Sequence, residues 1–156
     1  MHRYFFQMLL ILATAGLWAS CDKKDNDTKT EDTFKLSGNA AGANERPNPV
    51  TTNASGTITG TYSKEDKMLH YTINWTGLSG APLAMHFHGP ASPDSAAGVA
   101  KPITGFPVAV DGSVSGMEML TAEQEAQLLG GLWYYNIHTD ANKGGEIRGN
   151  ITAKAD

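Results

Sequence analysis

Three histidines are the residues of this chain best suited to chemistry. His86 and His88 stand two positions apart in the segment MHFHGP, and His138 follows later in the segment NIHT. Side chains two apart on a β-strand project to the same face, so the first pair could meet His138 from another strand. Such an imidazole cluster suits a transition metal. The cluster could equally be structural, with each ring forming a hydrogen bond to a loop carbonyl, and both interpretations stay open.

A metal site makes further demands on the residues around the histidines. Neutral imidazoles must reach about 2.0 Å from one ion, and their remaining ring nitrogens must be held by neighbouring groups. Asn136, Thr139, Asp140 and Glu146 lie close to His138 in the sequence and could supply those groups. We therefore treat three residues as candidate metal ligands, with copper as the candidate metal: His86, His88 and His138.

Charged residues near the C-terminus form a second candidate site. Glu146 and Arg148 flank Ile147 in the segment GGEIRG, so both face the same side of an expected strand. A buried ion pair that ties the N-terminal loop to this strand is the favoured interpretation, with Glu45, Glu146 or Asp140 as the partner of Arg148. The alternative is an anion-binding site at Arg148.

The N-terminal segment indicates where the protein resides. Residues 1–20 have the composition of a secretory signal peptide, with Arg3 followed by an apolar run too short to span a membrane. Cys21 is the single cysteine, so no intramolecular disulfide can form. Its position resembles that of the acylated cysteine of bacterial lipoproteins, which implies a lipid anchor in the bilayer. Residues 21–33 are charged and polar, and we expect them to form a disordered acidic tether.

Charge and composition narrow the function. The net charge is −4, and loss of Arg3 with the leader would make it −5. No basic stripe is present, which argues against nucleic acid as a partner. The segment GLSGA lacks the second glycine of a nucleophile elbow, and no thiol remains for catalysis once Cys21 is acylated. We expect a binding or structural module of the bacterial envelope, at the outer membrane or cell surface, rather than an enzyme. Its expected binding partner is another protein of the envelope.

The elements that must position these residues are β-strands. Short alternating runs separated by Gly, Asn, Asp and Pro predict an all-β domain over residues 34–156, an antiparallel Greek-key-like β sandwich. The clearest hairpin joins residues 57–62 to residues 68–75. One short helix is predicted up to Leu129, after a capping box at Thr121 and Gln124. Further strands are predicted at residues 34–38, 84–88, 106–110, 113–120, 132–138 and 146–153.

Four segments in order carry a family resemblance: FKLSGNAAGANERPNP, TGLSG, MHFHGPA and GLWYYNIHTDANKGGEIRGNI. Together they resemble the CHRD domain, first described as a repeat in chordin, over roughly residues 33–153. This resemblance implies an all-β extracellular domain and leaves its chemistry unspecified.

A more distant resemblance bears on mechanism. The HxH strand, the late histidine and the arginine of the final strand are similar in layout to copper/zinc superoxide dismutase, also a β sandwich like the immunoglobulin domains. This implies copper ligation by His86, His88 and His138 and anion guidance by Arg148. The chain lacks the zinc loop and the disulfide of that enzyme. A copper-binding or redox protein is therefore the alternative function.

Overall fold

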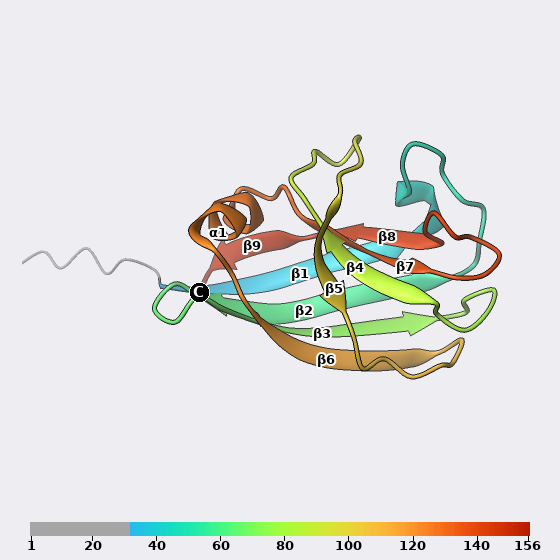
Figure 1. Ribbon diagram of the computed structural model, residues 1–156, viewed down its shortest axis with the longest axis horizontal. Helices are drawn as coiled ribbons and strands as arrows, with labels where there is room; N and C mark the ends of the chain where they lie inside the picture. The colour runs from blue at the N-terminus through green and yellow to red at the C-terminus, as the bar shows by residue number, and fades with distance from the viewer. Residues whose placement is uncertain (1–31) are drawn as a thin grey trace, which may run out of the picture.

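The computed structural model describes residues 32–156, so the expected leader, Cys21 and nearly all of the tether lie outside the described residues. The described strands form one antiparallel sheet that curls into a nearly closed, sandwich-like barrel (Figure 1). The prediction of an all-β fold with one short helix is confirmed. The elements are β1 (Thr33–Ala41), the 3-10 turn η1 (Gly42–Asn44), β2 (Ser55–Ser63), β3 (Met68–Thr76), β4 (Ala84–His88), β5 (Val99–Ile103), β6 (Gly112–Met119), α1 (Ala122–Leu129), β7 (Tyr134–His138), β8 (Ile147–Asn150) and β9 (Thr152–Ala155).

Strand order explains how distant segments meet. The sheet runs β5-β4-β7-β8-β1-β2-β3-β6, and β9 also pairs with β1. The predicted hairpin is confirmed, since β2 and β3 pair from Ser55 opposite Thr76 to Ser63 opposite Met68. Thr33, expected in the tether, is instead the first residue of β1. Both ends of the described chain lie at one end of the barrel, because Phe34 pairs with Ala155.

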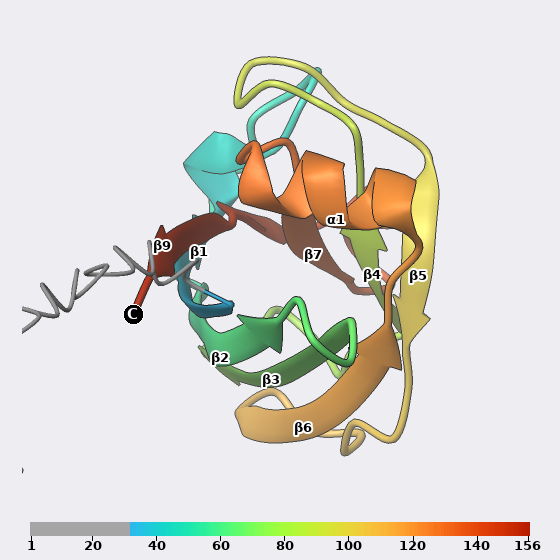
Figure 2. The ribbon, with the colours of Figure 1, turned by 90° about the vertical axis from the view of Figure 1, so that its left-hand side faces the viewer.

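The core lies between the two halves of the curled sheet. Aromatic rings fill much of it: Phe87 stacks on Trp133 at 5.9 Å between ring centroids and meets Tyr71 edge-on at 5.0 Å. The helix α1 lies across one end of the barrel beside β9 (Figure 2). Its predicted capping box at Thr121 and Gln124 is present. Within residues 32–156, no helix has the length and apolar character needed to cross a membrane.

One predicted strand is wrong and another was missed. Residues 106–110 form a loop, in which Val108 is 80% exposed and the carbonyl of Val110 accepts from the backbone of Leu78. The strand in this region is β5, which pairs with β4 at the edge of the sheet. Pro102 lies inside β5 and lacks the N–H of a ladder donor, which an edge position tolerates. Because Pro102 opposes a strand locally, the sequence pattern did not predict β5.

Candidate metal centre

Strand pairing brings the three histidines together. In the antiparallel β4–β7 ladder, Ala84 lies opposite His138 and His86 lies opposite Asn136. His86 and His88 share one face of β4, as their spacing predicts. One nitrogen of each ring lies within 4.8 Å of those of the other two. A point at most about 2.8 Å from all three therefore exists (4.8 Å divided by √3), against about 2.0 Å for a metal–imidazole bond.

Two of the rings touch each other directly. Nδ1 of His86 lies 3.1 Å from Nε2 of His138, and Nδ1 of His138 lies 2.9 Å from the carbonyl oxygen of Lys143. A carbonyl only accepts, so Nδ1 of His138 carries a hydrogen and donates to it. The lone pair of His138 is then on Nε2, and Nδ1–H of His86 donates to it. A metal ion could take the place of this hydrogen once the proton of His86 has moved to Nε2, so that the ring stays neutral and Nδ1 offers its lone pair.

The third ring is the most enclosed. His88 is buried, with Nδ1 at 3.0 Å from the carbonyl oxygen of Ala97 and Nε2 at 3.0 Å from Oδ1 of Asn136. The same argument places a hydrogen on Nδ1, which leaves Nε2 as the atom available to an ion. The ring stacks on Tyr134 with 4.7 Å between centroids. The loop that holds Ala97 therefore orients His88 from behind.

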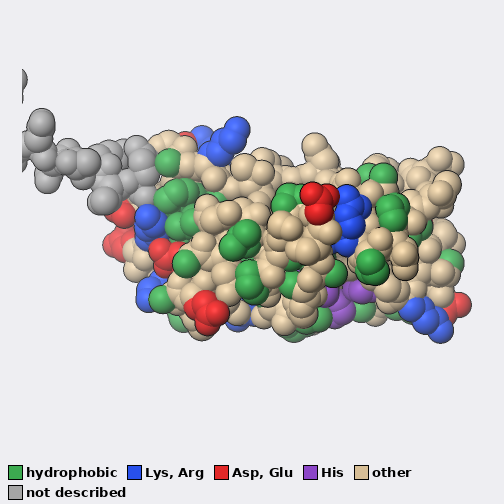
Figure 3. Space-filling model, turned by 90° about the horizontal axis from the view of Figure 1, so that it is seen from above, with side chains coloured by type: hydrophobic (Ala, Val, Ile, Leu, Met, Phe, Trp, Pro, Cys, Tyr) green, Lys and Arg blue, Asp and Glu red, His purple; other side chains and the backbone are tan. Residues whose placement is uncertain are grey.

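Electrostatics keeps two of these rings in the form that binds metals. Burial lowers the pKa of His86, and the neighbouring His138 and His88 lower it further. Burial also lowers the pKa of His138, although its hydrogen bond to Lys143 opposes the effect. Both rings are therefore neutral at pH 7, the state that coordination requires. His86 and His138 are partly exposed, which leaves a path for an ion, and histidine side chains are visible at the surface of the domain (Figure 3).

Glu146 has a different role from the one predicted. Its side chain is fully buried and accepts hydrogen bonds from the hydroxyl groups of Thr52, Ser79 and Thr139 and from the backbone of Ser79. Burial alone would raise the pKa of Glu146, but these hydrogen bonds outweigh it and the pKa falls. The carboxylate of Glu146 thus holds three loops together by accepting hydrogen bonds from each of them.

The direct ion pair expected for Arg148 is not formed. Among the described residues, no carboxylate oxygen lies within 4.0 Å of its guanidinium. The group instead lies over the ring of Tyr134, 3.6 Å from the centroid, and donates to the carbonyl of Ser92 and to Asn150. Glu45 acts on Arg148 only through its charge, and raises its pKa against the larger effect of burial. A cation–π contact with Tyr134 therefore stands where an ion pair was expected.

Burial of Arg148 also weakens the anion-site alternative. The side chain is 1% exposed, so an anion in solution cannot reach it without movement of the loop at Ser92. Asp140, the other partner considered, lies 3.6 Å from Lys143 instead. The superoxide-dismutase-like role of Arg148 therefore has no geometric support.

Two groups that orient the histidines could not be predicted from the sequence. They are backbone carbonyls, of Ala97 and Lys143, which any residue type can supply, so no sequence pattern marks them. The stacking of Tyr134 on His88 joins two strands, so it too has no signal in the local sequence. Ser79 and Thr52, which bind Glu146, come from loops whose approach depends on the whole barrel.

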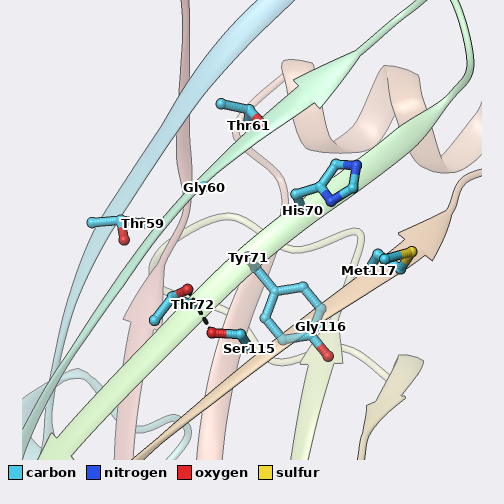
Figure 4. Close-up of a pocket in the computed structure, with 9 residues that line it drawn as sticks. All are labelled: Thr59, Gly60, Thr61, His70, Tyr71, Thr72, Ser115, Gly116 and Met117. Atoms are coloured by element: carbon cyan, nitrogen blue, oxygen red, sulfur yellow. Dashed lines mark hydrogen bonds between the residues drawn. The ribbon is translucent and has the colours of Figure 1, made fainter.

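Another hollow lies on the outer face of β2, β3 and β6 (Figure 4), with a volume of about 520 Å³. Four threonine and serine residues help to line it, and the hydroxyl groups of Thr72 and Ser115 are 2.8 Å apart. It contains a single imidazole, that of His70. This hollow therefore lacks the converging ligands found at the β4–β7 ladder.

The comparisons with known proteins agree with the resemblance seen in the sequence. The CHRD domain matches residues 36–151, which include every strand of the histidine cluster. No curated protein and no solved structure matches the chain. The match spans most of the chain, and the protein therefore belongs to the CHRD domain family.

Proposed function

We propose that this protein is a lipid-anchored module of the bacterial cell envelope whose CHRD domain binds a transition metal ion, copper or zinc. The ligands are His86, His88 and His138. The observation that carries the proposal is the convergence of one nitrogen from each ring to within 4.8 Å of the others.

The separation of the two touching rings supports an ion between them. Two ligands of a tetrahedral ion with bonds of about 2.05 Å lie roughly 3.3 Å apart. Nδ1 of His86 and Nε2 of His138 are 3.1 Å apart. Small side-chain rotations, chiefly of His88, complete the site. Imidazole ligands without carboxylates favour copper or zinc over calcium or magnesium.

Binding rather than catalysis is the proposed role. Within the described part of the chain, the carboxylate of Glu146 is occupied by four donors. The carboxyl of Glu45 and the cation of Arg148 are both buried. None of the three groups can act as a free acid, base or anion guide without rearrangement. An ion held by three histidines is therefore proposed as bound cargo or as a structural element.

The anchor is supported by the sequence. Cys21 ends an apolar leader, and the tether joins the domain at the start of β1. The far end of β1, at Ala41, pairs with Arg148 and so lies near the histidines. An anchored domain would thus keep its site away from the attachment point. Cys21→Ser should move the protein from the membrane fraction to the soluble fraction; retention in membranes would contradict the anchor.

Metal binding is tested with the purified mature chain. After incubation with Cu(II) or Zn(II) and removal of excess, we expect about one ion per chain by elemental analysis. Copper should show a type 2 electron paramagnetic resonance (EPR) spectrum. His88→Ala should abolish both results, whereas the matched control His70→Ala, on the outer face of β3, should retain them. A stoichiometry near zero for the wild type would overturn the proposal.

A further inference from the structure

We infer that Asn136 supplies a fourth ligand to the proposed metal ion through Oδ1, and that the buried Glu45 positions this oxygen. The inference rests on the proposed function, since it requires an ion at the three histidines. It assigns a ligand type, a neutral amide oxygen, that the histidine pattern does not contain.

Asn136 lies at the middle of the cluster. It is opposite His86 in the β4–β7 ladder and two residues before His138 on the same face of β7. Its Oδ1 is 3.0 Å from Nε2 of His88. Neighbouring ligands of one ion, each at about 2.0–2.2 Å from it, are roughly 2.8–3.6 Å apart for angles between 90° and the tetrahedral angle. The amide oxygen and the ring nitrogen therefore already stand at the separation of two ligands.

Two acceptor oxygens face the ring of His88. Its Nδ1 lies beside the carbonyl oxygen of Ala97, and its Nε2 lies beside Oδ1 of Asn136. An imidazole with one N–H can donate to only one of these oxygens, so its other nitrogen directs a lone pair at the second oxygen. A metal ion between Nε2 and Oδ1 would convert this unfavourable contact into two coordinate bonds.

Glu45 explains why the oxygen of the amide, rather than its nitrogen, faces His88. Glu45 and Asn136 approach the same glycine: a Cβ on Gly145 would overlap Oε1 of Glu45 and lie 2.7 Å from Nδ2 of Asn136. The carboxyl group of Glu45 offers acceptor oxygens, so it favours the amide NH₂ group over the amide oxygen as its neighbour. Glu45 therefore turns Oδ1 toward the site.

The cost of keeping Glu45 buried supports a role for it. It is 4% exposed, and no donor among the described residues lies within hydrogen-bond distance of Oε1, so Glu45 acts on the amide of Asn136 as a close polar neighbour and not through a short hydrogen bond. An unpartnered buried carboxylate oxygen is unfavourable for folding. Gly145, with a φ of 125°, leaves the space in which this oxygen sits. The arrangement makes sense if Glu45 orients a ligand, as groups behind metal ligands commonly do.

The test uses the mature chain loaded with Cu(II), with affinity measured by chelator competition and coordination by EPR. Asn136→Leu, which has a similar size and no oxygen, should weaken binding by about tenfold or more. Asn136→Asp supplies a charged oxygen, so it should tighten binding, lower g∥ and raise the copper hyperfine splitting. Asn39→Leu, an exposed asparagine of β1, is the matched control and should leave both readouts unchanged.

The role of Glu45 has its own signature. In Glu45→Gln the amide of Asn136 loses its preferred orientation, so the EPR spectrum should split into two species while three nitrogen ligands persist. A single species identical to the wild type would overturn the positioning role. If the wild type binds copper through three histidines but Asn136→Leu and Asn136→Asp both match it, the fourth ligand is refuted and the proposed function stands. If Asn136→Leu does not fold, an unchanged spectrum in Asn136→Asp refutes it alone. Failure of the wild type to bind refutes the proposed function itself.

Discussion

Replacing the buried carboxylate of Glu45 should stabilise the metal-free protein at alkaline pH. Burial raises the pKa of Glu45 from its model-compound value of 4.5 to about 7, although the charge of Arg148 partly opposes this. Among residues 32–156, no cationic group lies within 4.0 Å of the carboxyl of Glu45 to compensate its charge. Above neutral pH the folded protein therefore holds an ionised group that water would solvate better. Glu45→Gln keeps the shape of the side chain and removes the charge.

The pKa difference sets the sign and size of the effect. Below pH 4.5 the carboxyl is protonated in both the folded and unfolded states, so it adds no pH dependence there. Between pH 4.5 and about 7 the unfolded chain releases its proton first, so the folded state loses stability as the pH rises. At 1.36 kcal/mol for each pH unit between these values, the loss totals about 3 kcal/mol. Above about pH 7 it is complete.

Urea unfolding of the wild type and of Glu45→Gln, from about pH 5 to about pH 8, measures this difference. The free energies of unfolding should be similar near the acidic end and separate by about 3 kcal/mol, in favour of the variant, at the alkaline end. Glu65→Gln, at an exposed position in the β2–β3 turn, is the control and should follow the wild type. Parallel curves for wild type and Glu45→Gln would refute the argument that Glu45 is buried as a charge.

Three further predictions concern packing and hydrogen bonds. Glu146→Ala removes the charged acceptor of three hydroxyl groups, of which that of Thr139 is buried, and should cost about 3 kcal/mol in urea unfolding; a loss below about 1 kcal/mol would contradict this structural role of Glu146. Thr121→Ala removes the N-cap of α1 and should cost about 1 kcal/mol, which Thr121→Ser should restore. Gly89→Ala places a methyl group against Trp133 and should lower the free energy of unfolding by about 1–3 kcal/mol, whereas Gly144→Ala, which meets nothing within 4 Å, should not.

Local patterns predicted much of the fold. The alternation from Thr57 to Tyr62 and from Met68 to Trp75 predicted the β2–β3 hairpin, because side chains of a strand alternate between core and solvent. The capping box at Thr121 predicted where α1 begins, because that hydrogen bond is made within four residues. Strand β5 escaped prediction because Pro102 opposes a strand locally, whereas its edge position allows it.

The candidate site shows the same division between near and distant interactions. Spacing alone indicated that His86 and His88 share a face, since the period of a strand is a local property. That His138 meets them depends on the register of β7 against β4, which the packing of the whole barrel selects. The contact of Arg148 with the ring of Tyr134, in place of a carboxylate, likewise depends on how β7 and β8 pack. Composition and spacing therefore establish the chemistry available to this protein, whereas contacts between distant strands establish which groups meet, because those contacts depend on how all the side chains pack together.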